Sequence, residues 1–229
     1  MMKLWFAPNT CARVTMTALE EIGEEFQTSL VAFMAGEHRR PDYLAINPSG
    51  KVPALETPHG VLVQTGAMLT YLAETHAGAQ LLPATDDPFE RAKIRAEIFR
   101  CSSDLHPLVT RFVMGVMIST DTSDVPRIRA KAAETLMQQL APVEAQLARS
   151  EWYLGDRWSV LDAYVAWIWF RLTGNGFDAP AFPAISAHYA RALARPSAQA
   201  ALAREAAAEK ELEARGLLFR PQFDTGVRQ

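Results

Sequence analysis

Cysteine is scarce in this sequence, whose 229 residues contain only two, Cys11 and Cys101. A chain of this length with so few cysteines has no disulfide framework, so we expect reduced thiols and a cytoplasmic protein. The sequence also lacks an apolar run of about 20 residues, which a membrane-spanning helix needs. Its first residues meet Pro8 and Asn9 too soon for a secretory signal peptide. These features argue against a disulfide-stabilised secreted protein and against a membrane-spanning one.

The chain also has no large excess of charge of either sign. Its formal net charge is −3, which gives no support for binding to nucleic acids or to anionic membranes. Hydrophobic residues make up 49% of the chain and charged residues 21%, as in a globular protein with a buried core. The length fits one large domain or two small ones.

The most informative stretch is NPSGKVPALE, residues 47–56. Pro48 and Gly50 indicate a turn, after which the chain enters a short apolar strand. Proline has no N–H to donate to a sheet, so we expect Pro53 at the entrance of that strand. A cis bond before it costs little and would turn the Val52 N–H and C=O away from the sheet, free to hold a peptide like an added strand. The alternative is an ordinary loop before an edge strand.

A second stretch, QTGAMLTYLA, begins at Gln64. A short strand at residues 61–63 ends there, and Gln64 or Thr65 is expected to cap the helix that follows. The start of a helix offers unpaired N–H groups and a partial positive charge, which suit a carboxylate. Together the two stretches predict a site for a small anionic peptide.

These stretches resemble the two hallmarks of the glutathione transferase superfamily, an N-P-x-G-x-V-P-A-L run and an [EQ]-[ST]-x-A-[IM]-x-x-Y-L run. Both are present in order and at the family's spacing. The resemblance extends along nearly the whole chain, and residues 2–11 resemble the start of the bacterial beta class. It implies an enzyme with glutathione as co-substrate, no other cofactor and no metal.

The order of the expected elements agrees with this resemblance. Alternation and turn residues predict a βαβ unit followed by a ββα unit in the first third of the chain, which resembles a thioredoxin-like domain. Everything after residue 87 has helical periodicity. We therefore expect an α+β thioredoxin-like domain at 1–77, a linker at 78–87, and an all-α helical-bundle domain at 88–229 that forms the wall of the electrophile site.

Three features of the helical part are predicted in more detail. Pro88 is expected to open a long helix that bends near Pro107. Ser159 and Asp162 form a capping box, in which each residue satisfies an N–H of the other at the start of a helix. The apolar run behind it, residues 163–170, is expected to be the core helix of this part. We assign Asp162 to folding, not to catalysis.

A transferase must hold glutathione as its thiolate. If the thiol pKa resembles that of free cysteine, a drop of two units is worth roughly 2.7 kcal/mol. In this superfamily the donor to the sulfur lies just after the first strand and is tyrosine, serine or cysteine. The tyrosine-like position is Phe6, which has no hydroxyl. The remaining candidates are Asn9, Thr10 and Cys11.

Cys11 is the first choice, because the start of a helix lowers the pKa of a thiol. Its thiolate can also form a mixed disulfide with glutathione or attack a glutathionylated substrate. No second cysteine follows two residues later, which argues against a dithiol mechanism. In the alternative interpretation Cys11 is a small buried residue under the helix, and Thr10 or Asn9 supplies the donor.

His106 is the candidate from the helical part. Beta-class members carry a histidine after a similar Ser-x-Leu, near the glutathione sulfur. There it would help to stabilise the thiolate or a leaving group. The alternative is a helix histidine that is hydrogen-bonded next to the break at Pro107. We assign Cys101, on the same helix, to packing.

The resemblance assigns glutathione-binding roles to six residues: His38, Lys51, Val52, Pro53, Gln64 and Thr65. Val52 would pair its backbone with the cysteinyl part of glutathione. Gln64 and Thr65 would hold the γ-glutamyl amine and carboxylate. Lys51 and His38 would meet the glycyl carboxylate, as in theta-like members, unless they belong to a solvated basic loop.

The expected reaction is attack of the glutathione thiolate on an apolar electrophile, or thiol–disulfide exchange through Cys11. Residues 112–117 are candidates for the electrophile pocket, although they could equally be helix core. The alternative function is a non-catalytic module that binds glutathione or another ligand. The resemblance also implies a homodimer and a role in detoxification, with no nucleic-acid or membrane partner.

Overall fold

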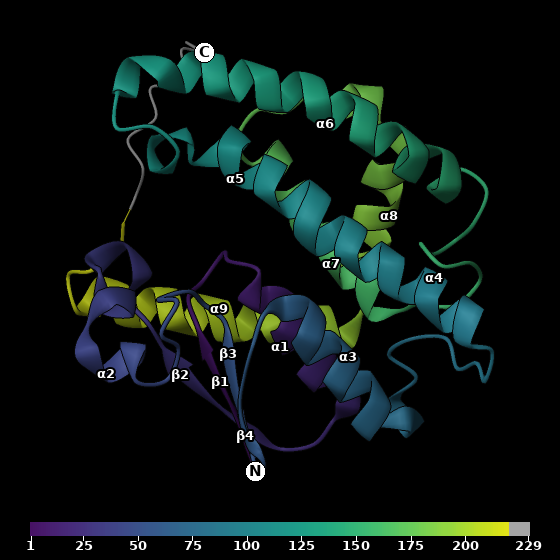
Figure 1. Ribbon diagram of the computed structural model, residues 1–229, viewed down its shortest axis with the longest axis horizontal. Coiled ribbons are helices and arrows are strands. Elements are labelled where there is room, and N and C mark those ends of the chain that lie inside the picture. Colours follow the sequence, from purple (N-terminus) through teal and green to yellow (C-terminus); the bar gives the residue numbers. More distant parts are fainter. Residues whose placement is uncertain (220–229) are drawn as a thin grey trace.

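The computed structural model describes residues 1–219, so the last ten residues of the predicted helical domain, 220–229, lie outside the described residues. Figure 1 shows a sheet flanked by helices in the lower half and a group of helices above it. The architecture confirms the expected α+β class, a thioredoxin-like unit followed by helices. No helix within residues 1–219 is both long and apolar enough to cross a membrane.

The sheet is mixed, with the strand order β2-β1-β3-β4. β1 pairs in parallel with β2 and antiparallel with β3, which in turn pairs antiparallel with β4. The strands are β1 (Met2–Phe6), β2 (Phe26–Leu30), β3 (Ala54–Thr57) and β4 (Gly60–Val63). Met2, Leu4 and Phe6 of β1 are buried, so the prediction of a buried central first strand is confirmed.

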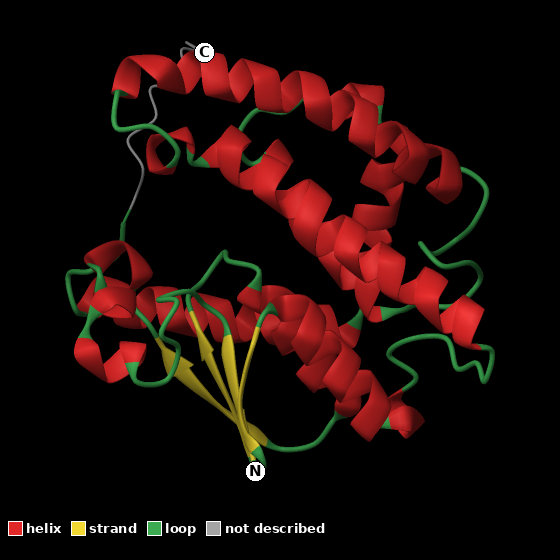
Figure 2. Ribbon diagram, viewed as in Figure 1, coloured by secondary structure: helices red, strands yellow, loops and turns green. Residues whose placement is uncertain are grey.

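Three helices lie beside the sheet, whose strands are yellow in Figure 2. One of these helices comes from the end of the chain. The three are α1 (Ala12–Ile22), α3 (Thr65–Thr75) and α9 (Pro196–Ala214), while the short α2 (Pro41–Leu44) lies in the loop before β3. α1 packs between α3 and α9. The return of α9 to α1 ties the two halves of the chain together, and no local pattern in the sequence predicts it.

The helical part is built around α7 (Val160–Thr173), whose residues are almost all buried. Its other helices are α4 (Pro88–Phe99), α5 (His106–Val113), α6 (Val125–Leu147) and α8 (Pro183–Leu193). α7 packs against α1, α5 and α8. The predicted core helix at 163–170 is therefore confirmed, and it also forms the contact between the helical part and the first helix of the chain.

Both proline predictions for the helical part are confirmed. Pro88 occupies the first turn of α4, and the Asp87 carboxylate caps that helix by accepting from the Phe89 N–H at 2.8 Å. The break near Pro107 is a π-helical turn over Arg100–Leu105, in which the His106 N–H donates to the Cys101 carbonyl. Pro107 has no N–H to continue the α-helical pattern across this point. The turn sets the position of His106 at the start of α5.

The capping box is present, and its acidic residue has a wider role than predicted. The Ser159 N–H donates to Asp162 Oδ2 at 2.7 Å. Asp162 Oδ1 accepts from the Tyr153 N–H at 2.7 Å and lies 2.8 Å from His188 Nε2. Asp162 and His188 are completely buried. The carboxylate therefore joins three segments of the helical part, which agrees with its assignment to folding.

Candidate active site

The turn before β3 has the geometry that the sequence predicts. The Val52–Pro53 bond is cis, and Pro53 directly precedes the strand. Two side-chain donors fix the Lys51 carbonyl just upstream: the Tyr43 hydroxyl at 2.7 Å and Asn47 Nδ2 at 2.6 Å. Within residues 1–219 the Val52 N–H donates no hydrogen bond. The cis bond is therefore confirmed, and the N–H is unbonded as expected, whereas the Val52 carbonyl is not free because it accepts from Cys11.

The start of α3 lies in the same region, but its cap differs from the prediction. Gln64 is the N-cap residue, with a positive φ of 72°, and neither its side chain nor that of Thr65 caps the helix. The Gln64 carbonyl accepts from the Met68 N–H at 3.1 Å, while its side chain is exposed. Thr65 is buried and lies near enough to Cys11 and to Tyr164 of α7 to lower the pKa of both groups. Gln64 therefore remains available to a ligand, and Thr65 faces the thiol.

Cys11 lies directly before α1, between the turn and the helix start just described. Its Sγ is 3.8 Å from the Val52 carbonyl oxygen, which accepts the thiol's hydrogen bond. Only 7% of the residue is exposed. Burial raises the pKa of the Cys11 thiol to about 11, against the opposing effects of Thr65, Arg171 and Lys51. The expectation that the helix start lowers this pKa is wrong, because the cost of burying a thiolate is larger.

The two alternative donors, Thr10 and Asn9, are engaged elsewhere. The Thr10 hydroxyl donates to the Ala7 carbonyl at 2.7 Å and accepts from the Ala12 N–H at 3.3 Å. Asn9 has a positive φ of 63°, and its Nδ2 donates to Glu209 Oε1 at 2.6 Å. Their side chains therefore hold the loop before α1 in place. Of the three candidate donors, Cys11 is the one that contacts the turn at Val52–Pro53.

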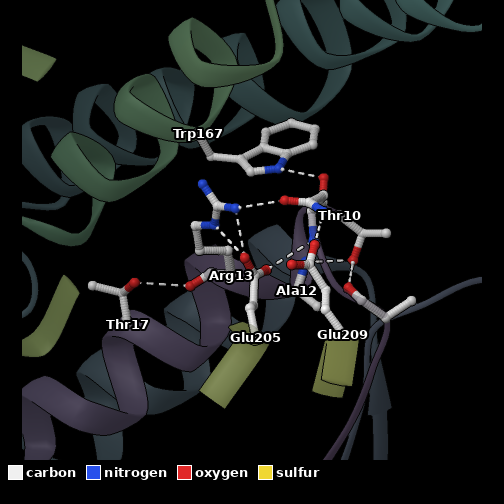
Figure 3. A network of polar contacts seen from close by, with 9 residues as sticks. Thr10, Ala12, Arg13, Thr17, Trp167, Glu205 and Glu209 are labelled. Carbon is white, nitrogen blue, oxygen red and sulfur yellow. Dashed lines mark hydrogen bonds and ion pairs between the residues drawn. The ribbon is translucent and has the colours of Figure 1, made fainter. Parts of the chain in front are cut away.

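A buried ion pair anchors this loop to α9 (Figure 3). Arg13 donates to Glu205 Oε2 from Nε at 2.8 Å and from Nη2 at 2.5 Å, and Nη2 also donates to Asn9 Oδ1 at 3.0 Å. Glu205 Oε1 accepts from the Asn9 N–H at 3.0 Å. The Trp167 indole of α7 donates to the Asn9 carbonyl at 3.4 Å. Sequence reasoning missed Glu205, which is 192 residues away from Arg13.

His106 lies at the start of α5 and contacts two aromatic residues of α7. Its Nδ1 lies 3.1 Å from the Tyr164 hydroxyl, and its ring packs edge-on against Trp167 with the centroids 4.6 Å apart. Burial, with a smaller contribution from the charges of Arg171 and Lys51, lowers the pKa of His106 to about 4. The imidazole is therefore neutral at pH 7. Sequence reasoning found His106 but missed its partner Tyr164, which only the aromatic richness of α7 could have suggested.

His38 and Lys51 come together on the other side of the turn. Lys51 is exposed, and the His38 ring stacks on Phe33 with the centroids 3.9 Å apart. Burial and the neighbouring Arg39 lower the pKa of His38. Gly50, which has a positive φ, lets the two segments approach: a Cβ at this position would lie 3.0 Å from the His38 carbonyl oxygen. Lys51, an exposed cation, therefore follows a glycine that lies close to the backbone of His38.

The predicted electrophile pocket at residues 112–117 is only partly present. Phe112 is buried, packs edge-on against Phe177, and carries the Arg129 guanidinium over its ring. It belongs to the core, as the alternative interpretation proposed. Val116 and Met117 are exposed. Cys101 is completely buried, in agreement with a packing role. Two residues of α7, Tyr164 and Arg171, lie near enough to Cys11 to interact with it electrostatically.

These groups place a buried thiol where a thioredoxin-like unit meets the helical part. Comparison with known proteins agrees with this arrangement. The family model described as the glutathione S-transferase N-terminal domain matches residues 1–74, and the one described as the C-terminal domain matches residues 126–191.

Individual relatives and structures agree with these matches. Maleylacetoacetate isomerase from Pseudomonas aeruginosa is 33% identical over 168 residues, which are 72% of this chain and 78% of the relative. The crystal structure of a glutathione transferase homologue from Sulfitobacter, with bound glutathione, has a TM-score of 0.80 at 32% identity and covers 89% of this chain and 98% of its own. A beta-class glutathione S-transferase from Sphingomonas chungbukensis has a TM-score of 0.76 at 29% identity, with coverages of 89% and 98%. The chain therefore belongs to the glutathione S-transferase family, and its enzyme class is glutathione transferase.

Proposed function

We propose that this protein binds glutathione along a groove that starts at Val52 and joins it through its sulfur to an electrophile lying against α7. The cysteinyl backbone of the peptide pairs with the Val52 N–H and with its carbonyl, which has a second lone pair beside the one that Cys11 uses. Gln64 and Thr65 hold the γ-glutamyl end. Lys51 and His38 hold the glycyl carboxylate. The observation that carries this proposal is the meeting of the Cys11 thiol, the Val52 carbonyl and Thr65 at one point.

When glutathione is bound, Cys11 turns its single S–H from the Val52 carbonyl to the glutathione sulfur and acts as a hydrogen-bond donor to it. Because burial raises the pKa of the Cys11 thiol to about 11, it keeps its proton at pH 7. A neutral S–H can donate to a neighbouring thiolate, whereas a second thiolate would repel it. Lys51 adds positive charge near the sulfur. His106 is neutral and takes part as a polar group, not as a cation.

The raised pKa of the Cys11 thiol favours conjugation over disulfide exchange. Exchange needs a thiolate that attacks a disulfide sulfur, and a thiol with a pKa of about 11 supplies little of it at pH 7. In conjugation the thiolate of glutathione forms a carbon–sulfur bond and the leaving group departs with its electron pair. Exchange through Cys11 therefore remains a secondary activity in this proposal, most visible at alkaline pH.

The alternative is a protein that binds glutathione or another ligand without turnover. The family fold alone does not choose the reaction, since the Pseudomonas relative bears the name of an isomerase. Retention on immobilised glutathione tests binding, and conjugation of 1-chloro-2,4-dinitrobenzene tests transfer. We expect both. Retention without conjugation or disulfide reduction would favour the binding module, and loss of retention would contradict the proposed groove.

We further propose a homodimer, in which the first domain of one copy meets the second domain of the other. Exposed apolar side chains on both parts support it: Val61 and Val63 on β4, and Phe89 and Phe99 on α4. We also propose that the chain divides into a first domain at 1–77, a linker at 78–87 and a second domain at 88–229. Light scattering of the purified full chain would give the mass of two chains if this is correct, and of one chain if it is not.

A cytoplasmic location and a role in detoxification complete the proposal, with no cofactor other than glutathione as co-substrate. Both cysteines are free thiols, which suits a reducing compartment that contains glutathione. Cell fractionation would test the location. Recovery from an oxidising compartment would contradict it.

A further inference from the structure

Arg171 lies on the face of α7 that looks toward the reacting centre. It follows Tyr164 and Trp167 at spacings of seven and four residues, which places all three on one side of the helix. Tyr164 contacts His106 at 3.1 Å, and Trp167 contacts the Asn9 carbonyl at 3.4 Å. This face therefore meets the start of α1 and of α5. Arg171 continues it by one turn and is partly buried.

The Arg171 guanidinium makes no hydrogen bond and no ion pair with any residue from 1 to 219. The neighbouring Arg13 is different, since Glu205 and Asn9 accept from it at 2.5 to 3.0 Å. Glu205 also accepts from the Asn9 N–H, so both of its oxygens are already used. Arg171 is near enough to Glu205 to feel its charge but makes no bond to it, so its planar donors remain open to an oxyanion from outside the chain.

The local charge around the thiol has one dominant sign. Arg171 and Lys51 are the charged groups that act on His106, and both also act on the Cys11 thiol. Both are cations. A negatively charged group brought to this side of the cleft would therefore meet an attractive field and a free set of donors.

We propose that Arg171 binds a carboxylate on the electrophile, so that the co-substrate is an anionic molecule with an electrophilic carbon and not a purely apolar one. This inference rests on the proposed function, because it names the substrate class of the same site. The carboxylate would lie on the guanidinium while the carbon faces the glutathione sulfur near Cys11. Bidentate Arg–carboxylate pairs fix orientation as well as affinity, which would hold the reacting carbon in place.

A matched pair of electrophiles tests this assignment: 4-chloro-3,5-dinitrobenzoate and its neutral amide, 4-chloro-3,5-dinitrobenzamide. In both, the glutathione thiolate forms a bond to the ring carbon that bears chlorine. The carbon–chlorine bond breaks, chloride leaves with the electron pair, and the thiol proton goes to solvent. The two molecules differ in charge at the far end of the ring, and the uncatalysed rate of each corrects for their intrinsic reactivity.

The variants are Arg171→Gln, Arg171→Lys and, as a matched control, Arg149→Gln, which removes an exposed arginine just beyond α6. We expect R171Q to lower kcat/KM for the benzoate by about tenfold or more, the usual effect of losing a charged hydrogen bond, and to change the amide by less than about twofold. R171K should be intermediate, and R149Q should match the wild type. Glutathione affinity should stay unchanged in all three variants.

Two results would overturn the assignment. An equal loss with both electrophiles would mean that Arg171 acts on the thiolate, and a weaker glutathione affinity in R171Q would mean that it binds glutathione. Calorimetry with the two synthetic glutathione conjugates, one with the carboxylate and one with the amide, separates this inference from the proposed function. If the wild type prefers the carboxylate conjugate but turns over neither electrophile, transfer fails and the assignment stands. If it shows no such preference, the assignment fails whether or not transfer occurs.

Discussion

The thiol of Cys11 donates to the carbonyl oxygen of Val52 across 3.8 Å, and so joins the start of α1 to the cis turn before β3. The two residues are 41 positions apart in the chain. Their contact brings the Cys11 thiol to Val52, whose backbone N–H donates no hydrogen bond within residues 1–219. The proposed role of Cys11 depends on this contact more than on the pKa of its thiol.

Replacement of Cys11 tests that role. We expect Cys11→Ala to abolish disulfide exchange and to lower the rate of conjugation by about tenfold or more, because a hydrogen bond to a charged sulfur is lost. Cys11→Ser keeps a donor at the same place and should retain more of the conjugation rate. Glutathione affinity, measured by calorimetry, should stay within a few-fold in both. Normal disulfide exchange by C11A would reassign the role to Thr10 or Asn9.

The raised pKa of Cys11 predicts a pH-dependent stability. The folded protein keeps the thiol proton up to a pKa of about 11, above the model-peptide value of 9.0, so it binds more protons than the unfolded chain between these values. Stability must therefore fall as the pH rises from about 9 to 11, by roughly 3 kcal/mol for two pKa units. Urea unfolding at both ends of this range should show a smaller fall in C11A than in the wild type. The same fall in both proteins would show that other groups cause it.

The lowered pKa of His106 predicts a loss of stability at acidic pH, whereas that of Cys11 predicts a loss at alkaline pH. Burial lowers the pKa of His106 to about 4 from the usual 6.5, so the unfolded chain binds more protons between these values. Stability is therefore lost as the pH falls from 6.5 to 4, by roughly 3 kcal/mol. His106→Gln should remove this contribution, and an NMR titration should show His106 neutral throughout pH 5 to 8. A titration near 6.5 would contradict the burial of this ring.

The Arg13–Glu205 pair predicts a large effect on stability. We expect Glu205→Gln to lower the free energy of unfolding by about 3 to 5 kcal/mol, since it leaves a buried guanidinium without its carboxylate. Glu134→Gln is the control, because the Lys131–Glu134 pair is exposed and should change stability by less than about 1 kcal/mol. Urea unfolding of both variants gives the comparison. Equal effects would mean that the buried network in Figure 3 does not stabilise the loop before α1.

Gly50 offers a test of the groove that does not alter any donor. Gly50→Ala and Gly23→Ala both place a side chain at positive φ, and each should cost about 1 to 2 kcal/mol of stability. Gly23 has open space around it, whereas a Cβ at Gly50 would lie 3.0 Å from the His38 carbonyl oxygen. G50A should therefore also weaken glutathione binding, and G23A should not. Unchanged glutathione binding in G50A would mean that His38 and Lys51 do not contact the ligand.

Local signals account for what the sequence predicted correctly. Pro53, Pro88 and the Ser159–Asp162 capping box each act through their own backbone or through neighbours within a few residues, and each occurs where it was expected. The central position of β1 followed in the same way from a short apolar run.

The features that sequence reasoning missed depend on distant contacts. Glu205 reaches Arg13 only because α9 returns to α1, and Tyr164 reaches His106 because α7 crosses α5. Arg171 was overlooked for the same reason. The sequence predicted a lowered pKa for Cys11, but burial raises it. A helix start is a local feature, whereas burial depends on what the whole chain packs around the thiol.

The central claim is that glutathione lies extended from Val52 to Gln64 and Thr65 with its sulfur at Cys11, and a crystal structure of the full chain with glutathione tests it most directly. The account predicts backbone hydrogen bonds to Val52 and a sulfur–sulfur distance of about 3.5 to 4 Å to Cys11. A sulfur nearest to Thr10 or Asn9, or an unoccupied groove at saturating glutathione, would contradict it.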